Sequence, residues 1–500
     1  MDALQNIVVE TAQGKVKGVE ERDGIVVFRG IPYAAPPVGE NRWKEAKPHE
    51  RWEGILDCSS FGNSAPQNMM DEVSQLIWTE EFQISNRTYS EDCVTLNLWT
   101  KAGLRDMPVV VYFYGGGYVS GGSSCEIYDG TVLSEAGIVY VTFNHREGTL
   151  ALFAGEELSK KSESGTSGNY MLSDDIAALR WVKENIRSFG GDPDNVTIWG
   201  QSSGAGQVNA LSISPLAKGL FSKVISMGYN NYVDFLFSKP WMEQKEAYAF
   251  GKELLQQMGC SLEEAYEKDF HEFLKYPQFG TLQIDGRYIK SDFRHGVHSG
   301  LTDGIPFMMG SVPGDAVVMP FLRPAMACGE KKALEEVLSG FFGPENTKEI
   351  WKAYEIENRE NPEVLAEMKE DLLVGAMLDF ALGRKERECG ELTYIYYFRH
   401  PMPGPNQTRF GAFHSCEVPY FMNHFSALRD VYWKEEDFAL GALSSRELIH
   451  FIKTGKPAGD EFLPSDGTNY YSIDAAEQQN LILDPRKRDL WFEIFKGGVR

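Results

Sequence analysis

Three short apolar runs in the first half of the chain constrain its fold more than any other feature. They are MPVVVYFY at 107–114, GIVYVTF at 137–143 and NVTIW at 195–199. Each is rich in β-branched and aromatic residues, which is typical of a strand buried on both faces. Because helical patterns separate the runs, we expect a mostly parallel, twisted sheet with helices on both faces, which is an α/β fold.

The segment between the second and third runs predicts a crossover helix. In SDDIAALRWVKENIRSFGGDP, at 173–193, four apolar residues fall on one helical face: Ile176, Leu179, Val182 and Ile186. Two aspartates fall in the expected first turn, and two glycines follow the end. The second half, from about 233 to 390, is richer in helical patterns, notably at 245–259 and 363–383, and we expect these helices to cap the sheet.

Composition and charge exclude several classes of protein. A hydrophobic content of 42% is typical of a packed globular chain, and no repeat or long linker divides residues 1–500, so one domain is expected. The net charge of −23 disfavours nucleic acid and anionic lipid as partners. The start lacks a signal-peptide pattern, and no apolar run approaches the roughly 18 residues of a membrane span. We expect a soluble, unexported, cytoplasmic chain of undetermined oligomeric state.

A serine stands between two glycines in TIWGQSSGAGQ, at 197–207, directly after the third apolar run. A Gly-x-Ser-x-Gly match alone is weak evidence, and a plain Gly/Ser turn is the alternative. Here the motif follows a predicted strand and opens a predicted helix, which is the setting in which a sharp elbow exposes a serine hydroxyl. Ser202 is therefore a candidate nucleophile.

A nucleophile of this kind needs backbone amides that face a developing oxyanion. Three glycines, at 115–117, follow the first apolar run and let the backbone turn its amides toward a ligand. A flexible loop or a phosphate-binding turn is the alternative, but neither Gly-x-Gly-x-x-Gly nor a Walker lysine is present there.

The serine also needs a histidine as base and a carboxylate that orients the histidine, in the chain order serine, acid, histidine. Asp315 follows an apolar run and is a candidate acid. Spacing does not choose among the histidines after residue 300: His400, His414, His424 and His450.

Several longer motifs resemble one known family. FRGIPYAAPPVGENRW at 28–43 is similar to its N-terminal signature, and SEDCVTLNLW at 90–99 to its second signature. The stretch at 168–206 is similar to its crossover helix and elbow. The chain thus resembles the type-B carboxylesterase, cholinesterase and lipase family, from near Gly18 to about Phe421. This resemblance implies an α/β-hydrolase fold.

The resemblance also implies the roles of individual residues. Ser202 becomes the nucleophile, Asp315 the acid, and His414, in GAFHSCEVPYFM, the base of a G-x-x-H-x-x-E motif. The oxyanion amides are then those of three residues: Gly116, Gly117 and Ser203. Two structural ion pairs are implied as well: Arg42 with Glu91, and Arg146 with Asp174.

The chain departs from the family pattern at several positions. Gln201 stands where the family usually has Glu, Ser203 where Ala is usual, and Asp315 where Glu is commoner. Tyr229 lies in a stretch that has lost a second serine of the family. Cys93 matches a cysteine that exported relatives pair with one upstream, but the partner position is Ala65. A reducing compartment and the bacterial para-nitrobenzyl esterase branch fit this last departure best.

The expected function is that of a serine carboxylic ester hydrolase that acts on small neutral or aryl and alkyl esters through an acyl-enzyme. Neither a metal nor an organic cofactor is expected, since the seven cysteines are scattered without a Cys-x-x-Cys pair. Adjacency to catalytic positions makes Tyr118, Tyr229 and Phe413 candidate pocket residues, with a core role as the alternative. The rival functions are a specialised hydroxycinnamoyl (feruloyl-type), lipid or polyester esterase, and a catalytically silent binding protein on the same scaffold.

Overall fold

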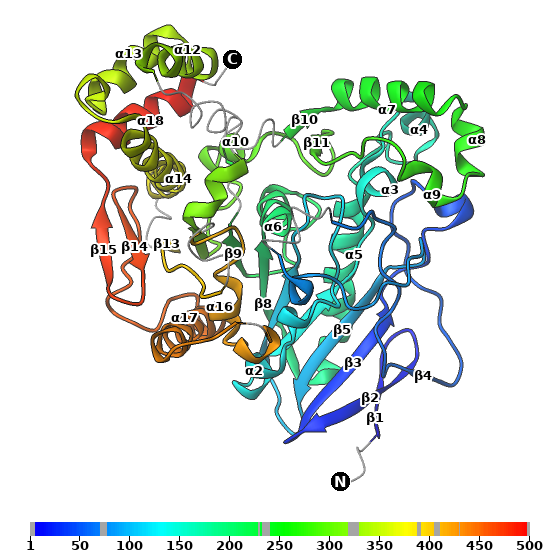
Figure 1. Cartoon of the computed structure of the whole chain (residues 1–500). Coiled ribbons are helices and arrows are strands. Elements are labelled where there is room, and N and C mark those ends of the chain that lie inside the picture. The colour runs from blue at the N-terminus through cyan, green and yellow to red at the C-terminus, as the bar shows by residue number, and fades with distance from the viewer. Residues whose placement is uncertain are drawn as a thin grey trace.

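A long mixed β-sheet forms the centre of the protein in the computed structural model (Figure 1), which describes residues 6–70, 78–228, 231–232, 241–318, 330–387, 392–404, 411–429 and 431–497. Within these residues the main sheet has 13 strands. Their order across the sheet is β1 (Asn6–Glu10), β2 (Lys15–Arg22), β3 (Ile25–Pro32), β5 (Thr95–Lys101), β7 (Val139–Phe143), β6 (Met107–Phe113), β8 (Gly191–Gln201), β9 (Lys223–Met227), β12 (Phe307–Ser311), β13 (Thr393–Phe398), β14 (Asn469–Ile473) and β15 (Gln478–Ile482), while β4 (Ile55–Asp57) pairs with β2.

The middle of the sheet is parallel and its margins are antiparallel. Every neighbouring pair from β7 to β14 is parallel, whereas β1, β2, β3, β5 and β15 join by antiparallel pairing, and β4 adds a parallel pair with β2. The three predicted runs are β6, β7 and β8, and they lie side by side. The predicted mostly parallel sheet is therefore confirmed. A separate short pair is formed by β10 (Trp241–Glu243) and β11 (Leu282–Ile284).

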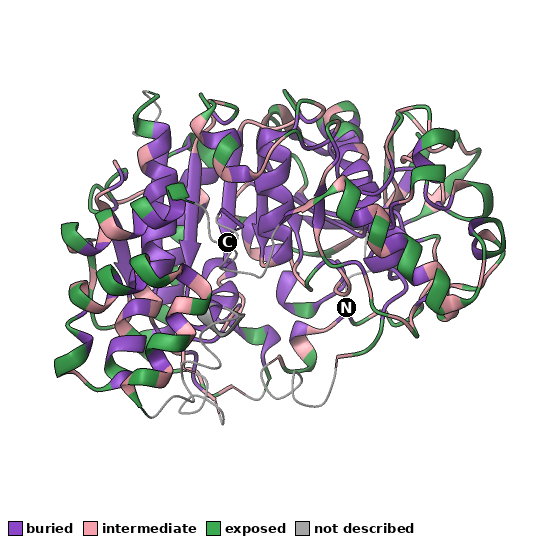
Figure 2. Ribbon diagram, turned by 90° about the horizontal axis from the view of Figure 1, so that it is seen from above, coloured by how far each residue is buried: buried purple, intermediate pink, exposed green. Residues whose placement is uncertain are grey.

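Strand β6 shows why the apolar runs predict burial on both faces. Val109, Val111 and Phe113 belong to one hydrophobic core cluster, and Val110 and Tyr112 belong to another. Because successive side chains of a strand point to opposite faces, each core lies on one side of the sheet. Figure 2 shows the strands and the inward faces of the helices buried, with exposed residues on the outside.

Helices supply the other half of each core. The larger core receives buried side chains from α3 (Gly148–Leu152), α4 (Glu156–Lys161), α5 (Tyr170–Asn185), α6 (Ser203–Ile213), α7 (Gln244–Met258), α8 (Leu262–Tyr266), α9 (Phe270–Phe273), α10 (Phe293–His298), α12 (Lys331–Phe342), α13 (Pro344–Ala353), α14 (Asn361–Lys385) and α18 (Pro485–Gly497). The smaller core receives them from α2 (Thr131–Glu135), α16 (Val418–Met422) and α17 (Glu435–Thr454). The predicted helices on both faces are confirmed.

The helical patterns of the second half correspond to α7 and α14. In Figure 1, α12, α13, α14 and α18 stand on one side of the upper part of the molecule, and α7, α8 and α9 stand on the other. Among the described helices, none is long and apolar enough to cross a bilayer.

The crossover helix α5 begins one turn earlier than the sequence pattern predicts. It starts at Tyr170, after Asn169 in the left-handed conformation, so that Asp174 and Asp175 lie beyond the first turn instead of within it. Both aspartates are buried. The predicted apolar face of the helix does pack into the larger core. The aspartates serve tertiary contacts, which explains why their helix-start signal is misleading.

Both ion pairs implied by the family resemblance are present. Arg42 pairs with Glu91 and also donates to three backbone carbonyls at 265, 266 and 268. Arg146 donates from Nη2 to Asp174 Oδ1 at 2.6 Å and from Nε to Oδ2 at 2.9 Å, and its backbone amide donates to Oδ2 at 3.0 Å. The side chains of Arg146 and Asp174 are 3% and 1% exposed, so this pair is buried.

We expect Asp174→Asn to lower the free energy of unfolding by about 3–5 kcal/mol, because the neutral amide leaves the Arg146 guanidinium buried without its counter-charge. Urea unfolding followed by circular dichroism would measure the change. The matched control is Asp106→Asn, which removes the carboxylate from the exposed Arg187–Asp106 pair and should change stability very little. Equal effects of the two substitutions would contradict a structural role for the buried pair.

Candidate active site

Ser202 sits at a tight turn between the end of β8 and the start of α6. Its φ is 56° and its ψ is −129°, a strained combination for a residue with a side chain. The two glycines of the motif allow the turn, because a Cβ on Gly200 would lie 2.1 Å from the Gly204 carbonyl oxygen, and one on Gly204 would lie 2.1 Å from the Phe113 carbonyl oxygen. The close approach of these backbones gives the predicted strand, turn and helix.

His414 lies within hydrogen-bonding distance of both Ser202 and Asp315. Its Nε2 is 2.8 Å from Ser202 Oγ, and its Nδ1 is 2.5 Å from Asp315 Oδ1. The elbow follows β8, Asp315 lies in the short helix η5 (Pro313–Val318) after β12, and His414 precedes α16. Three segments that follow different strands thus converge.

The other candidate histidines lie elsewhere in the fold. His400 Nε2 is 2.8 Å from Asp437 Oδ1, so this ring is engaged by α17. His450 is exposed on α17, and its Nδ1 is 2.8 Å from the Lys456 carbonyl oxygen. Burial lowers the pKa of His424, which is half-buried beside η8 (Phe425–Ala427). Among the four, His414 has both a serine and a carboxylate at its two ring nitrogens.

Asp315 is fixed in position by its own neighbours. Its Oδ2 accepts hydrogen bonds from Ser311 Oγ at 2.6 Å and from the Val312 amide at 2.9 Å, and the residue is 1% exposed. These two donors leave Oδ1 to accept the Nδ1–H of His414. A carboxylate at Nδ1 holds the imidazole in the tautomer whose Nε2 can accept a proton from a serine hydroxyl.

The glycine turn lies beside the elbow. A Cβ on Gly115 would lie 2.6 Å from Ser202 Cβ, so only glycine allows this approach. The Gly116 carbonyl accepts the amides of residues 119 and 120, which folds the turn back on itself. Gly116 and Gly117 line the same cavity as Ser202, and Ser203 is the first residue of α6, a position whose amide has no acceptor within the helix. The predicted oxyanion amides are therefore near Ser202, and their role stays a prediction.

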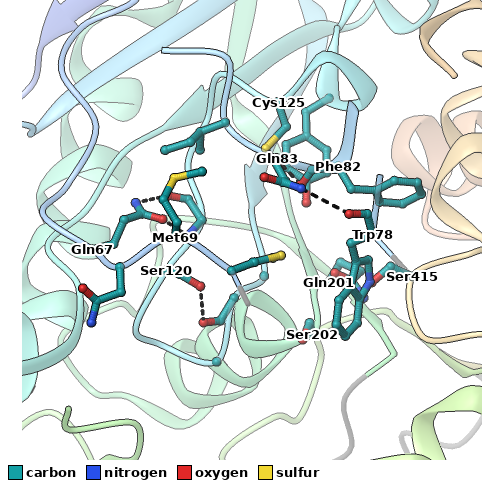
Figure 3. Close-up of a pocket in the computed structure, with 18 of the residues that line it drawn as sticks. Gln67, Met69, Trp78, Phe82, Gln83, Ser120, Cys125, Gln201, Ser202 and Ser415 are labelled. Atoms are coloured by element: carbon teal, nitrogen blue, oxygen red, sulfur yellow. Dashed lines mark hydrogen bonds between the residues drawn. The ribbon is translucent and has the colours of Figure 1, made fainter. Parts of the chain in front are cut away.

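A cavity of about 340 Å³ opens over these residues. Besides the catalytic candidates, large side chains of its wall include Gln67, Met69, Trp78, Phe82, Tyr89 and Tyr128. Among the described residues that line the cavity, none is Asp, Glu, Lys or Arg. Figure 3 shows Ser202, Gln201 and Ser415 close to Trp78, with Gln67 and Met69 across the cavity. The wall is thus a mixture of aromatic, thioether and neutral amide groups.

The sequence motifs do not reveal the part of the wall that comes from residues 67–70 and 78–89. This segment lies between the two N-terminal signatures and has no helical or strand periodicity that would place it. Trp78 Nε1 donates to the His414 carbonyl at 3.1 Å, which also ties the wall to the segment that carries the histidine. The one sequence signal that could have indicated this wall is the frequent occurrence of aromatic and amide residues just before the second signature.

The predicted pocket residues have three different positions. Tyr118, with φ of 64°, belongs to the larger hydrophobic core, and Phe413 belongs to the smaller one. Neither is among the described residues that line the cavity. Phe413 packs edge-on against Phe82, which does line it, with ring centroids 6.1 Å apart. Tyr229 lies outside the described residues. An effect of these residues on substrate choice stays a prediction.

Two further ionisable residues, Cys416 and Glu417, follow His414 closely in the chain. Burial raises the pKa of the Glu417 carboxyl well above its usual range, and the neighbouring Asp315 carboxylate raises it further. Burial also raises the pKa of the Cys416 thiol, so this thiol is a protonated and unreactive neighbour. Within the described parts of the chain, no group of three or more His, Cys, Asp or Glu side chains is arranged to hold a metal ion.

Comparisons with known proteins agree with this geometry. A model of the carboxylesterase family matches residues 5–283. The chain is 28% identical to para-nitrobenzyl esterase of Bacillus subtilis (strain 168), with 95% of this chain and 94% of that protein covered. It is 41% identical to fumonisin B1 esterase of Sphingopyxis macrogoltabida over a shorter stretch, which covers 44% of this chain and 39% of that protein.

Solved structures show the same fold over almost the whole chain. A structure of PNB esterase superimposes with a TM-score of 0.79 at 25% identity, covering 97% of this chain and 99% of the other. A carboxylesterase of Geobacillus stearothermophilus superimposes with a TM-score of 0.78 at 27% identity, with the same coverage. The predicted α/β-hydrolase fold is confirmed. The chain belongs to the carboxylesterase family and is an enzyme that hydrolyses carboxylic esters.

Proposed function

We propose that this esterase acts through an acyl-enzyme on Ser202. His414 Nε2 takes the hydroxyl proton as Ser202 Oγ attacks the ester carbonyl, and the negative charge moves to the carbonyl oxygen. The amides of Gly116, Gly117 and Ser203 stabilise that oxyanion. The intermediate collapses when His414 returns the proton to the leaving alcohol. Water, deprotonated by His414, then attacks the acyl-enzyme and releases the acid.

One observation carries this proposal, namely the continuous chain of contacts from Ser202 to His414 to Asp315 at the floor of the cavity. A serine hydroxyl is a weak nucleophile, and activation by an adjacent base raises its reactivity. The distances of 2.8 Å and 2.5 Å already lie in the range that proton transfer and orientation require.

The cavity supports small neutral esters with aryl or alkyl groups as the substrate class. A charged substrate group would lose its hydration in a wall without a complementary charge among the described residues, which costs free energy. Aromatic side chains such as Trp78 and Phe82 instead favour contact with flat or apolar groups. A volume of about 340 Å³ favours small substrates.

The test combines active-site labelling with turnover. After incubation with a fluorophosphonate, intact-mass spectrometry should show one adduct on the parent and none on Ser202→Ala. The parent should also hydrolyse para-nitrophenyl acetate and butyrate faster than the octanoate. Ser212→Ala is the matched control, since Ser212 lies on the same helix α6 and its hydroxyl donates to the Asn209 carbonyl of that helix. A labelled Ser202→Ala, or an unlabelled and inactive folded parent, would contradict the proposal.

A further inference from the structure

Ser415, the residue directly after His414, has an unusual backbone conformation. Its φ is +82°, in the left-handed region that favours glycine. A residue with a Cβ pays roughly 1 kcal/mol or more in this region. Glycine would avoid this cost, so the serine side chain is expected to make a compensating contact.

That contact is a buried hydrogen bond to the residue before the nucleophile. Gln201 Nε2 donates to Ser415 Oγ at 2.8 Å, and the two residues are 2% and 7% exposed. Gln201 precedes Ser202 and Ser415 follows His414, so this bond joins the two segments whose side chains must meet. Figure 3 shows Gln201 and Ser415 beside each other, next to Ser202.

The other end of the Gln201 amide faces the glycine turn. A Cβ on Gly115 would lie 2.8 Å from Gln201 Oε1, so the amide oxygen is close to the backbone that leads into Gly116 and Gly117. One neutral side chain therefore touches the elbow, the glycine turn and the segment that carries the base.

The surroundings of this side chain are acidic. A Cβ on Gly228 would meet three polar atoms: Glu417 Oε1 at 3.1 Å, Gln201 Nε2 at 3.2 Å and Asp315 Oδ1 at 3.6 Å. Among the described residues, neither oxygen of Glu417 has a hydrogen-bond partner. Among the described residues, the ionisable side chains of this region include His414, Asp315, Glu417, Cys416, Tyr396 and Tyr397 on β13, and Lys369 on α14. An amide at 201 adds a donor here without adding a further negative charge.

We propose that Gln201 and Ser415 form a positioning pair, in which the Gln201 amide holds the left-handed turn after His414 so that Nε2 faces Ser202 Oγ, and does so without adding a second carboxylate to that of Asp315 beside the imidazole. This inference rests on the proposed function of the triad. Neither side chain is a catalytic residue. The pair acts through the placement of His414.

A double-mutant cycle tests the pair. Gln201→Met keeps the length of the side chain and removes the donor, and Ser415→Ala removes the acceptor. Each single variant should lower kcat for para-nitrophenyl acetate about tenfold with little change in KM, as expected for the loss of one buried hydrogen bond that orients the base. The double variant should be no slower than the slower single variant. Multiplying effects, or an unchanged kcat in both single variants, would overturn the proposal.

Ser415→Gly separates positioning from folding. It relieves the backbone strain but also removes the hydroxyl, so its melting temperature should equal or exceed that of Ser415→Ala, while its kcat falls to the same extent. A purely structural role predicts that kcat recovers together with the melting temperature. Recovery of parent kcat in Ser415→Gly would therefore overturn the proposal.

The pH profile of kcat/KM tests whether a neutral side chain at position 201 matters. Gln201→Glu retains an acceptor for the Ser415 hydroxyl but places a carboxylate near the imidazole, which stabilises the protonated ring. The acid limb of the pH profile of kcat/KM should then move to higher pH in Gln201→Glu and stay in place in Gln201→Met. Superimposable profiles of Gln201→Glu and the parent would overturn the charge argument.

The failure of the pair can be distinguished from the failure of the proposed function. If a fluorophosphonate does not label the parent, the proposed function is wrong. If the parent is labelled but the effects of Gln201→Met and Ser415→Ala multiply, only the positioning pair is wrong.

Discussion

Replacing His414 with alanine is expected to lower kcat for ester hydrolysis by roughly a thousandfold or more, and adding Ser202→Ala to that variant should cost almost nothing further. The two residues act as one unit, because the serine is not activated without the base, and the base has no function without the serine. Their contact of 2.8 Å in the resting site is the structural reason for this coupling. Turnover of para-nitrophenyl butyrate by both single variants and the double variant would measure it.

The control for this cycle is His450→Ala, which removes an exposed histidine on α17 and should leave kcat unchanged. The residual rate of the double variant reports what binding and the backbone amides contribute without a nucleophile. Near-parent turnover of His414→Ala, or effects of the two substitutions that multiply, would show that the base is another group.

Asp315→Asn is expected to lower kcat by about a thousandfold to ten-thousandfold, with the fold intact. The reason lies in the two donors that face Oδ2. Ser311 Oγ and the Val312 amide would hold the oxygen of an asparagine, so its NH₂ group would take the place of Oδ1. That NH₂ donates toward Nδ1 of His414, which must then lose its own hydrogen. The hydrogen moves to Nε2, where the ring can no longer accept the serine proton.

Steady-state kinetics of Asp315→Asn, with circular dichroism to check folding, would measure this loss. Asp303→Asn is the matched control, since that exposed carboxylate pairs with Arg387 and lies before strand β12, whereas Asp315 follows the other end of the strand. Parent-like turnover of Asp315→Asn would require another acid, and Glu417→Gln would then be the variant to examine, because that buried carboxyl is close enough to Asp315 for the Asp315 charge to raise its pKa.

The sheet was predictable because burial on two faces leaves a strong local pattern. Strand β6 has to satisfy both cores at once, so its sequence is apolar without interruption, and β7 is apolar apart from Thr142. The start of α5 was not predictable in this way. Acidic residues near a helix start normally interact with the helix dipole. Here Asp174 is selected by its contact with Arg146, which only the folded chain brings near.

In the candidate site, too, some residues could be predicted from local sequence and others could not. Motifs predicted the elbow and the glycine turn, and the family resemblance was needed to choose His414, since local sequence carries no sign of which histidine meets Asp315 across 99 positions. The wall residues at 67–70 and 78–89 could not be predicted because their sequence lacks the periodicity of a strand or a long helix, and they are placed by distant contacts such as that of Trp78 with His414. Tyr118 is next to the glycine turn in sequence, but its backbone has a left-handed conformation and its side chain lies in the larger hydrophobic core. The single domain and the cytoplasmic location stay predictions.

The spacing of the three converging segments along the chain has a consequence for how the protein becomes active during synthesis. Ser202 leaves the ribosome 212 positions ahead of His414, and the family match at 5–283 contains the serine but neither the acid nor the base. A growing chain can form the elbow and still have no group to activate it. Contacts of such long sequence separation form late in folding. In the proposed mechanism, ester turnover therefore requires the far half of the sheet, and we expect a chain truncated after residue 283 to resist acylation at Ser202.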